Sequence, residues 1–200
     1  MAFRWRFAPH TDLASEGARS ARTFHALTEA SRETWTAVVE ADARFARGLP
    51  GWLMDNLAVL RNDCHGFAVD RLEHCLQTAT RAHRDGRDEE YVTCALFHDV
   101  GAALAPDSHA EFVALVLRPY ISERNHWMLL HHGIFQSYYF AHFFDGDRNA
   151  RRKFRRHPHY EYTAEFCDRY DQAAFDPNYP SMTLDDFKPI VARVLGCRRA

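Results

Sequence analysis

The residues best suited to do chemistry in this chain are His98 and Asp99, which end the apolar stretch VTCALFHDVG. Neighbouring residues of a helix point about 100° apart, but near a helix end both side chains can face one ion. An imidazole nitrogen with a carboxylate oxygen suits iron, manganese, zinc or nickel. Taken alone, the pair has a second interpretation, in which His98 is a hydrogen-bonded core residue and Asp99 a surface residue.

Further His and Asp residues lie at intervals that place them on successive helices. His74 lies among Leu72, Leu76 and Ala79 at helical spacing, near a buried face. The other candidates, on later helices, are His109, His131, His132 and Asp171. Buried imidazoles and carboxylates are costly without a shared partner, and helical bundles collect them around metals. The pattern therefore favours a metal site over separate structural residues.

Helical periodicity positions these residues, and alternation typical of strands is rare. We expect an all-α, single-domain bundle over residues 1–200, with a helical extension (1–60) and a metal-binding helical core (61–200). Helices are predicted over residues 12–48 (one or two), 69–84, 88–100, 108–117, 122–144, 160–174 and 183–195. A short segment, 52–60, is expected to lead into a loop at 62–66.

The predicted extension has its own internal pattern. Its apolar residues predict an inward face made of Trp35, Val38, Val39 and Phe45. The residues expected to break its helices are Gly48, Pro50 and Gly51. The sequence does not assign this part a role, and a covering of the bundle and a homodimer contact both stay open.

Composition narrows the class of protein. The chain has 200 residues, 46% of them hydrophobic, which fits one domain with a real core. A formal net charge of -2 gives no reason to expect nucleic acid as a partner. Five cysteines without a CxxC pair predict free, mostly buried thiols. With no apolar run of membrane-spanning length and no signal peptide, we expect a soluble cytoplasmic protein without membrane contact.

The order of the candidate residues, H…HD…H…H…D, resembles the HD-domain superfamily, whose founding members are metal-dependent phosphohydrolases. The stretch RLEHCLQTATRAHRDGRDEEYVTCALFHDVG, residues 71–101, is more similar to the HD-domain di-iron oxygenases. That branch includes a phosphonate-cleaving oxygenase and, more distantly, inositol oxygenase. The similarity is strong over residues 68–102, fainter to 172, and says nothing about 1–60.

The resemblance implies two metal ions, in a mixed-valent pair of Fe2+ and Fe3+. One would be held by His74, His98, Asp99 and Asp171. Asp99 would bridge to a second ion held by His109 and by His131 or His132. The spacing from His109, and the position of Gln136 one turn later, favour His132. Asp99 is then the central catalytic residue.

Differences from the phosphonate-cleaving oxygenase lie in its substrate-binding positions. Ala102 stands where that family has a substrate-binding His, and Gln136 where it has a Lys. Cys64 and Phe67 stand at the places where that family has an aromatic and an acidic residue ahead of the first His. The substrate is therefore expected to be a different small polar molecule. The residues predicted to contact it are Gln77, Gln136 and Tyr139, with Phe175 and Tyr179 as candidates for a cover.

Three functions follow from this reading. The first is an oxygenase that uses O2 and the iron pair to cleave or oxidise a small organic substrate. The second is a phosphohydrolase that uses Mn2+, Mg2+ or another divalent metal on a nucleotide or small phosphate ester. It is weakened because no Lys lies near the motifs and the Arg cluster of residues 148–156 is distant in sequence. The third is a non-catalytic bundle, which a complete ligand set disfavours.

Overall fold

The computed structural model describes residues 24–62 and 66–196, and in them it contains helices and no strands. The all-α prediction is confirmed. The chain divides into two compact units, residues 1–48 and 49–200. The second unit includes α2, so most of the short segment 52–60, which was assigned to the extension, is helical and belongs with the core helices. Cys64 and Cys197 lie outside the described residues, whereas Cys75, Cys94 and Cys167 are free and buried, as predicted.

The first unit contains a short 3-10 turn (Leu27–Glu29) and α1 (Arg32–Ala46). Ser31 caps α1 by accepting a hydrogen bond from the Thr34 amide. The inward face predicted for this helix is wrong, because α1 has no buried residue and both Val39 and Phe45 are more than half exposed. Apolar residues at helical spacing show that a helix has an apolar face. That face is buried only where another element packs against it.

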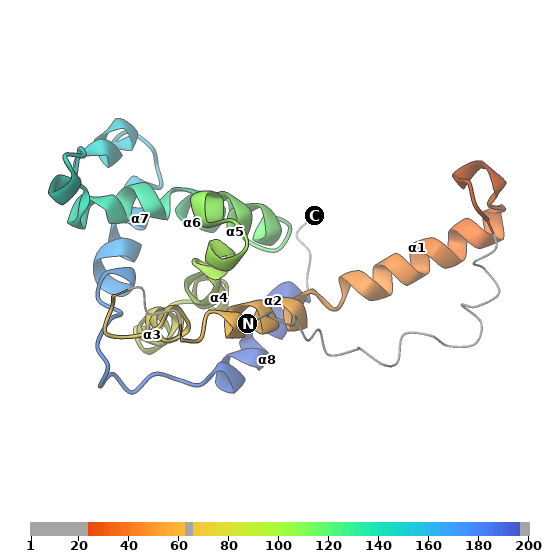
Figure 1. The fold of residues 1–200 in the computed structure, drawn as a ribbon, viewed down its shortest axis with the longest axis horizontal. Coiled ribbons are helices and arrows are strands. Elements are labelled where there is room, and N and C mark those ends of the chain that lie inside the picture. Colours follow the sequence, from red (N-terminus) through yellow and green to blue (C-terminus); the bar gives the residue numbers. More distant parts are fainter. Residues whose placement is uncertain (1–23, 63–65, 197–200) are drawn as a thin grey trace, which may run out of the picture. The chain divides into compact units, whose positions relative to one another are not determined.

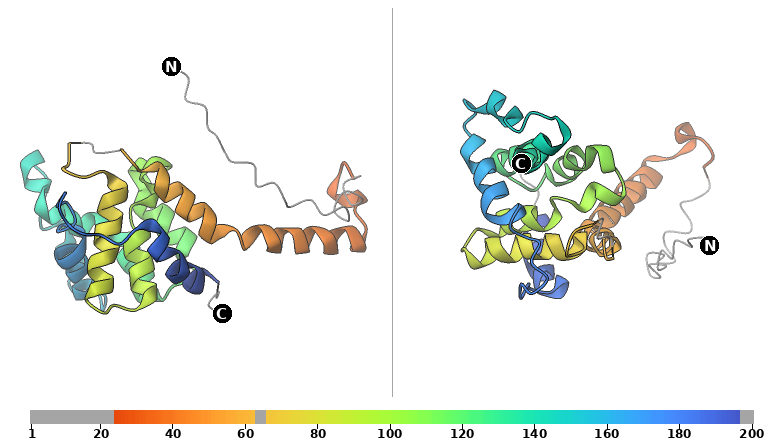
Figure 2. Two further views of the ribbon diagram at one scale, coloured as in Figure 1. Left: turned by 90° about the horizontal axis from the view of Figure 1, so that it is seen from below. Right: turned by 60° about the vertical axis from the view of Figure 1, so that its left-hand side comes forward.

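The second unit is a bundle of the remaining helices, shown in Figure 1. Their bounds are α2 (Leu49–Val59), α3 (Arg71–Arg84), α4 (Glu89–Phe97), α5 (His109–Leu117), α6 (Glu123–Gln136), α7 (Tyr160–Phe166) and α8 (Leu184–Leu195). Figure 2 shows α3 and α4 alongside each other. α5 packs against α6, and α6 against α7. α4 is buried from Tyr91 to Phe97 and contacts α3, α6 and α8, so it forms the centre of the core.

Caps define where the site helices begin. Asp70, Asp88 and Ser122 accept hydrogen bonds from the third amide of α3, α4 and α6 respectively. Pro50 and Gly51, expected to break a helix, instead lie in the first turn of α2. Proline is tolerated there because the first amides of a helix have no intrahelical acceptor.

Two predicted helices end early, and both ends bear on the site. The helix predicted over 122–144 ends at Gln136 and continues as 3-10 turns, where the Ser137 hydroxyl donates to the Ile134 carbonyl. Such back-bonding bends a helix. The helix predicted over 160–174 changes at Cys167 into a π-helical segment, η8 (Cys167–Asp171). Its wider turn alters the direction of the side chains that follow, including Asp171.

No helix in residues 24–62 and 66–196 has both the length and the apolar character needed to cross a membrane.

Candidate metal centre

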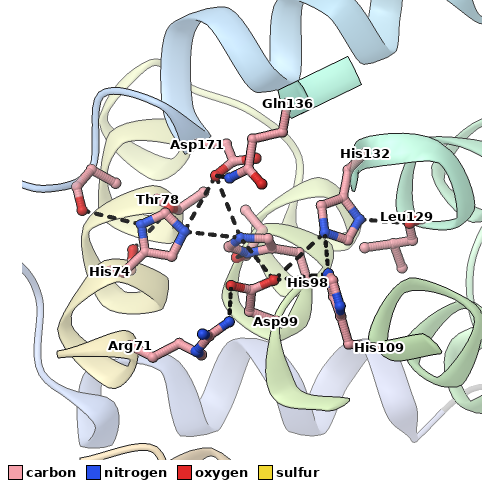
Figure 3. A network of polar contacts seen from close by, with 12 residues as sticks. Arg71, His74, Thr78, His98, Asp99, His109, Leu129, His132, Gln136 and Asp171 are labelled. Carbon is pink, nitrogen blue, oxygen red and sulfur yellow. Dashed lines mark hydrogen bonds and ion pairs between the residues drawn. The ribbon is translucent and has the colours of Figure 1, made fainter. Parts of the chain in front are cut away.

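Five elements of the second unit bring the predicted ligands into one cluster, drawn in Figure 3. His74 comes from the first turn of α3, and His98 and Asp99 from the end of α4. His109 begins α5, which follows α4 after two 3-10 turns. The cluster is completed by His132 of α6 and Asp171 of η8.

The first half of the cluster, here the inner group, consists of His74, His98 and Asp171. The Nε2 atoms of His74 and His98 are 3.1 Å apart. Asp171 Oδ1 lies 3.2 Å from Nε2 of His74 and 3.7 Å from Nε2 of His98. All three side chains are buried, and Asp171 and His98 are 0% exposed. These atoms are close enough to share one ion.

The second half, here the outer group, consists of Asp99, His109 and His132. Asp99 Oδ1 lies 3.4 Å from Nε2 of His109 and 3.6 Å from Nε2 of His132. The two Nε2 atoms are 3.3 Å apart. Oδ1 of Asp99 also lies 3.8 Å from Nε2 of His98, so this carboxylate joins the two groups. Burial lowers the pKa of His109, which favours the neutral ring that a metal requires.

All four imidazoles present the same nitrogen to the centre, because backbone carbonyls hold the other one. Nδ1 of each ring contacts one carbonyl oxygen: that of Ala174 for His74, Ala95 for His98, Pro106 for His109 and Leu129 for His132. A carbonyl only accepts, so each Nδ1 carries the hydrogen and each neutral ring presents a lone pair on Nε2. Backbone bonds of this kind orient the histidines of metal sites.

The charges at the centre also call for a cation. Burial alone would raise the pKa of Asp99, but His98 and His132 outweigh it and hold that pKa well below its usual range. Burial is likewise outweighed at Asp171 by the adjacent rings of His74 and His98, which lower its pKa. The pKa of His74 is raised, because Asp171 more than offsets the effect of burial. Both carboxylates are therefore charged inside a buried cluster.

The donor set fits metal ions. Each close pair of Nε2 atoms brings two lone pairs together without a hydrogen between them, which is unfavourable unless a cation or an added proton lies there. Asp171 Oδ2 is buried and has no hydrogen-bond partner among the residues that the structure describes. Two groups, His74-His98-Asp99 and Asp99-His109-His132, have ligand atoms within 4.8 Å of one another. Imidazole with carboxylate suits iron, manganese or zinc better than magnesium, which prefers oxygen ligands.

His131, the alternative to His132, points elsewhere. Its ring stacks on Trp127 at a centroid distance of 4.1 Å, and its Nδ1 bonds the Trp127 carbonyl. Trp127 also stacks on His157, 4.2 Å away. His131 therefore belongs to a packing cluster, and His132 is the residue of this pair that reaches the centre.

The predicted substrate residues are not all brought to the centre. Gln136 lies beside it, donating from Nε2 to Asp171 Oδ1 at 2.8 Å. Gln77 is fully buried and both ends of its amide bond the backbone of Asp176, so it faces a chain segment and not a cavity. The Tyr139 hydroxyl donates to Asp168 at the surface. Only Gln136 of the three lines the cavity described below.

A cavity of about 200 Å³ reaches the centre through His74 and Asp99. Its other lining residues in the described part of the chain are Phe67, Val69, Asp70, Arg71, Gln136, Phe140 and Phe175. Phe175, one of the two predicted cover residues, stacks on His74 at 4.4 Å and on Phe67 at 4.8 Å. Tyr179, the other, lies under Arg81 and Arg84 and does not line the cavity.

Arg71 was missed by the sequence reasoning. Its Nη1 lies 3.2 Å from Asp99 Oδ2, so it holds the carboxylate that joins the two ligand groups. Its position three residues before His74, one helical turn away on α3, was the available signal.

A family model for the HD domain matches residues 71–173, just over half of the chain and all six clustered residues. The chain belongs to the HD domain family. A search of curated proteins found no match. Family and geometry together support a metal-dependent HD enzyme, and they leave the identity of the metal and the type of reaction open.

Proposed function

We propose that this protein is a dinuclear iron oxygenase, which uses O2 to cleave or oxidise a small polar organic substrate. The observation that carries the proposal is a pair of ligand groups that share Asp99 and meet a cavity walled by phenylalanine side chains. Four imidazoles and two carboxylates suit iron, and aromatic walls favour chemistry that must be shielded from water. The resemblance of residues 71–101 to the HD-domain oxygenases supports the same choice.

Iron, when bound, would supply the activation of O2 and the electron-transfer steps that oxidation requires. The chain's own residues would fix the geometry. His74, His98 and Asp171 would hold one ion, and His109 and His132 the other. Asp99 would join the two.

Other residues would position the substrate and protect it. Arg71 keeps Asp99 in place through Oδ2. The Gln136 amide donates to Asp171 through Nε2, and its oxygen would be the atom that accepts a hydrogen bond from the substrate. Phe175 covers His74 and, together with Phe67, keeps water from that side of the centre.

Oxygen consumption tests this proposal directly. Protein loaded with iron under anaerobic conditions would be mixed with oxygenated buffer and a panel of small hydroxy acids, polyols and amino alcohols. We expect substrate-dependent O2 uptake that Asp99→Asn abolishes. Hydrolysis of a phosphate ester without O2 uptake on any panel member would refute the oxygenase.

The second candidate is a metal-dependent phosphohydrolase, favoured by the presence of Arg71 in the cavity, where a cation could face a phosphate. A screen of nucleotides and phosphomonoesters with Mn2+-loaded protein distinguishes the two. Phosphate release with Mn2+ that is independent of O2 would support this candidate, and its absence would leave the oxygenase.

A further inference from the structure

In the outer group, Asp99 and His109 face each other from different segments of the chain (Figure 3). Asp99 follows α4, whereas His109 begins α5. The first of the two 3-10 turns between them, η3 (Val100–Ala103), packs against α5. The distance between these two ligands therefore depends on how closely the turn approaches the start of α5.

Gly101 lies buried in this turn, against the backbone of His109. A Cβ added at Gly101 would lie 2.9 Å from the His109 carbonyl oxygen and 3.0 Å from the His109 Cα. It would also lie 3.0 Å from Cδ1 of Phe112. Ordinary contacts of a Cβ begin near 3.4 Å, so the His109 backbone would have to move by about 0.5 Å to admit a methyl group.

Space, and not backbone conformation, is the reason for a glycine at this position. The described glycines with a positive φ, the conformation that favours glycine, are Gly66 and Gly86. Gly101 instead lies in a 3-10 turn, whose backbone angles any residue adopts. What the missing side chain permits is the close approach of another backbone.

The carbonyl of Gly101 also holds the connection to α5. It accepts hydrogen bonds from the amides of Leu104 and Ala105, at 3.0 and 2.7 Å. The His109 ring has weaker support of its own, because its Nδ1 is 3.4 Å from the Pro106 carbonyl and its side chain is 27% exposed. Packing against Gly101 is therefore a closer constraint on His109 than the hydrogen bond of its ring.

The other two ligands of the outer group are held by different contacts. Asp99 contacts Arg71 at 3.2 Å, and the buried His132 ring lies 2.7 Å from the Leu129 carbonyl. The ligands of a metal site must be held within about 0.5 Å of their working geometry. A shift of His109 alone would therefore weaken the outer ion and leave the inner group intact.

We propose that Gly101 is the positioning residue that brings His109 to Asp99 and so allows the centre to hold a second ion. A side chain at position 101 would keep the inner group complete and move one ligand of the outer group out of place. The inference rests on the two-ion centre of the proposed function. It does not depend on whether the reaction is an oxidation or a hydrolysis.

Anaerobic titration of the metal-free protein with Fe2+ tests the inference. Gly101→Ala is expected to weaken binding of the outer ion about 10–100-fold, as loss of a ligand's support does, and to leave the affinity of the inner ion unchanged. Electron paramagnetic resonance of protein given two equivalents of Mn2+ is the second readout. The wild-type protein should show two magnetically coupled ions and Gly101→Ala an isolated ion, a change that a general loss of stability would not produce.

Three further variants make the effect specific. Gly133→Ala is the matched control, because this glycine follows His132 and an added Cβ would meet no described atom within 4 Å beyond its own stretch of helix. It should keep two ions. Gly101→Ala/Phe112→Ala removes the ring that also meets the new methyl group but keeps the contact with the His109 backbone, so the outer ion should still be lost. Phe112→Ala alone should keep two ions.

The results that overturn the inference differ from one another. Wild-type affinity for both ions in Gly101→Ala overturns it, and so does equal weakening of both, which would indicate a merely structural role. Recovery of the outer ion in the double variant also overturns it, because Phe112 and not the His109 backbone would then be the obstacle. A crystal structure of the Mn2+-loaded wild-type protein needs no variant to fold. It should keep the His109 backbone against Gly101, and a gap wide enough for a methyl group would overturn the inference.

Failure of this inference is distinguishable from failure of the proposed function. If the wild-type protein binds one ion only, the dinuclear centre fails and the inference fails with it. If the wild-type protein binds two ions and Gly101→Ala retains both, the inference alone fails. If Gly101→Ala loses the outer ion but the wild-type protein consumes no O2 with any substrate, the oxygenase fails and the role of Gly101 stands.

Discussion

The two ligand groups of the centre are joined by Asp99 but differ in their surroundings. The inner group, His74, His98 and Asp171, is buried, and its His74 is covered by Phe175. In the outer group the His109 side chain is 27% exposed. His109 does not line the cavity, which reaches the centre through His74 and Asp99. The centre is therefore accessible from two sides, one at the cavity and one at His109.

The difference follows from the segments that hold each group. Residues 172–182 cross α3 and are fixed to it by Gln77 on Asp176, Glu73 on Ser181 and Thr80 on Met182. This segment supplies the Ala174 carbonyl that orients His74. His109 instead follows two 3-10 turns, and its own carbonyl contact, to Pro106, is 3.4 Å long. We therefore expect the inner ion to be held tightly and the outer ion to exchange.

Removing the Asp99 carboxylate should have the largest effect on metal binding, because Asp99 contacts both ligand groups. Asp99→Asn is expected to weaken metal binding in both groups by more than the ~10–100-fold lost with an outer partner of a ligand. Metal content after dialysis measures it. Asp168→Asn, at an exposed carboxylate that bonds Tyr139, is the control and should keep two ions. Retention of both ions by Asp99→Asn would show that Asp99 does not join the groups.

Replacing one histidine in each group should separate them. His109→Ala is expected to lose the outer ion only and to change the free energy of unfolding by less than about 1 kcal/mol, since the ring is partly exposed. His98→Ala is expected to lose the inner ion and to cost about 3 kcal/mol, as large-to-small changes in a core do. Metal analysis and urea unfolding of the metal-free proteins measure both. If both variants lost the same amount of metal and the same free energy of unfolding, the two histidines would not hold separate ions in differently buried groups.

Chelation should reveal the same difference kinetically. When excess EDTA is added to the protein loaded with two ions, we expect two phases of equal amplitude, the fast one from the outer group. His109→Ala should remove the fast phase and leave the slow one. A single phase for the wild-type protein would argue against the difference in access.

The smallest effect on metal binding is expected from changes in the segment that covers His74. Gln77→Leu removes two hydrogen bonds to Asp176 and should lower the free energy of unfolding by about 2 kcal/mol, because backbone groups lose partners. It should also weaken inner-group metal binding about 10-fold through the loss of His74 orientation. Gln172→Leu, at an exposed amide in the same segment, is the control. If EDTA removed the inner ion from Gln77→Leu as slowly as from the wild-type protein, the segment would not support the inner group.

Local signals were sufficient to predict the helical class and to mark the candidate ligands, whereas the choice of the six clustered residues also needed the resemblance to HD-domain proteins. His74 and His132 each lie on an apolar helix face, and the caps Asp70 and Asp88 are adjacent to the helices they start. These features depend on neighbours within one or two turns, so the sequence contains them. That the six residues bind metal stays a prediction.

Features that depend on distant partners could not be predicted. Gln77 was placed near a substrate, although its partner Asp176 lies 99 residues away and determines what its amide can do. The burial expected for Val39 and Phe45 depends on what packs against α1, and in the structure both side chains are more than half exposed. Arg71 was overlooked because its contact with Asp99 forms only when α3 and α4 pack together.

The central claim is that one carboxylate, Asp99, joins two metal-binding groups. The most direct measurement is a crystal structure of the iron-loaded protein with anomalous data at the iron edge. We expect two iron ions about 3.5–4 Å apart, the usual spacing in two-metal sites, with Asp99 bonded to both. One ion on His74, His98, Asp99 and Asp171, with His109 and His132 bound to nothing under saturating iron, would contradict it.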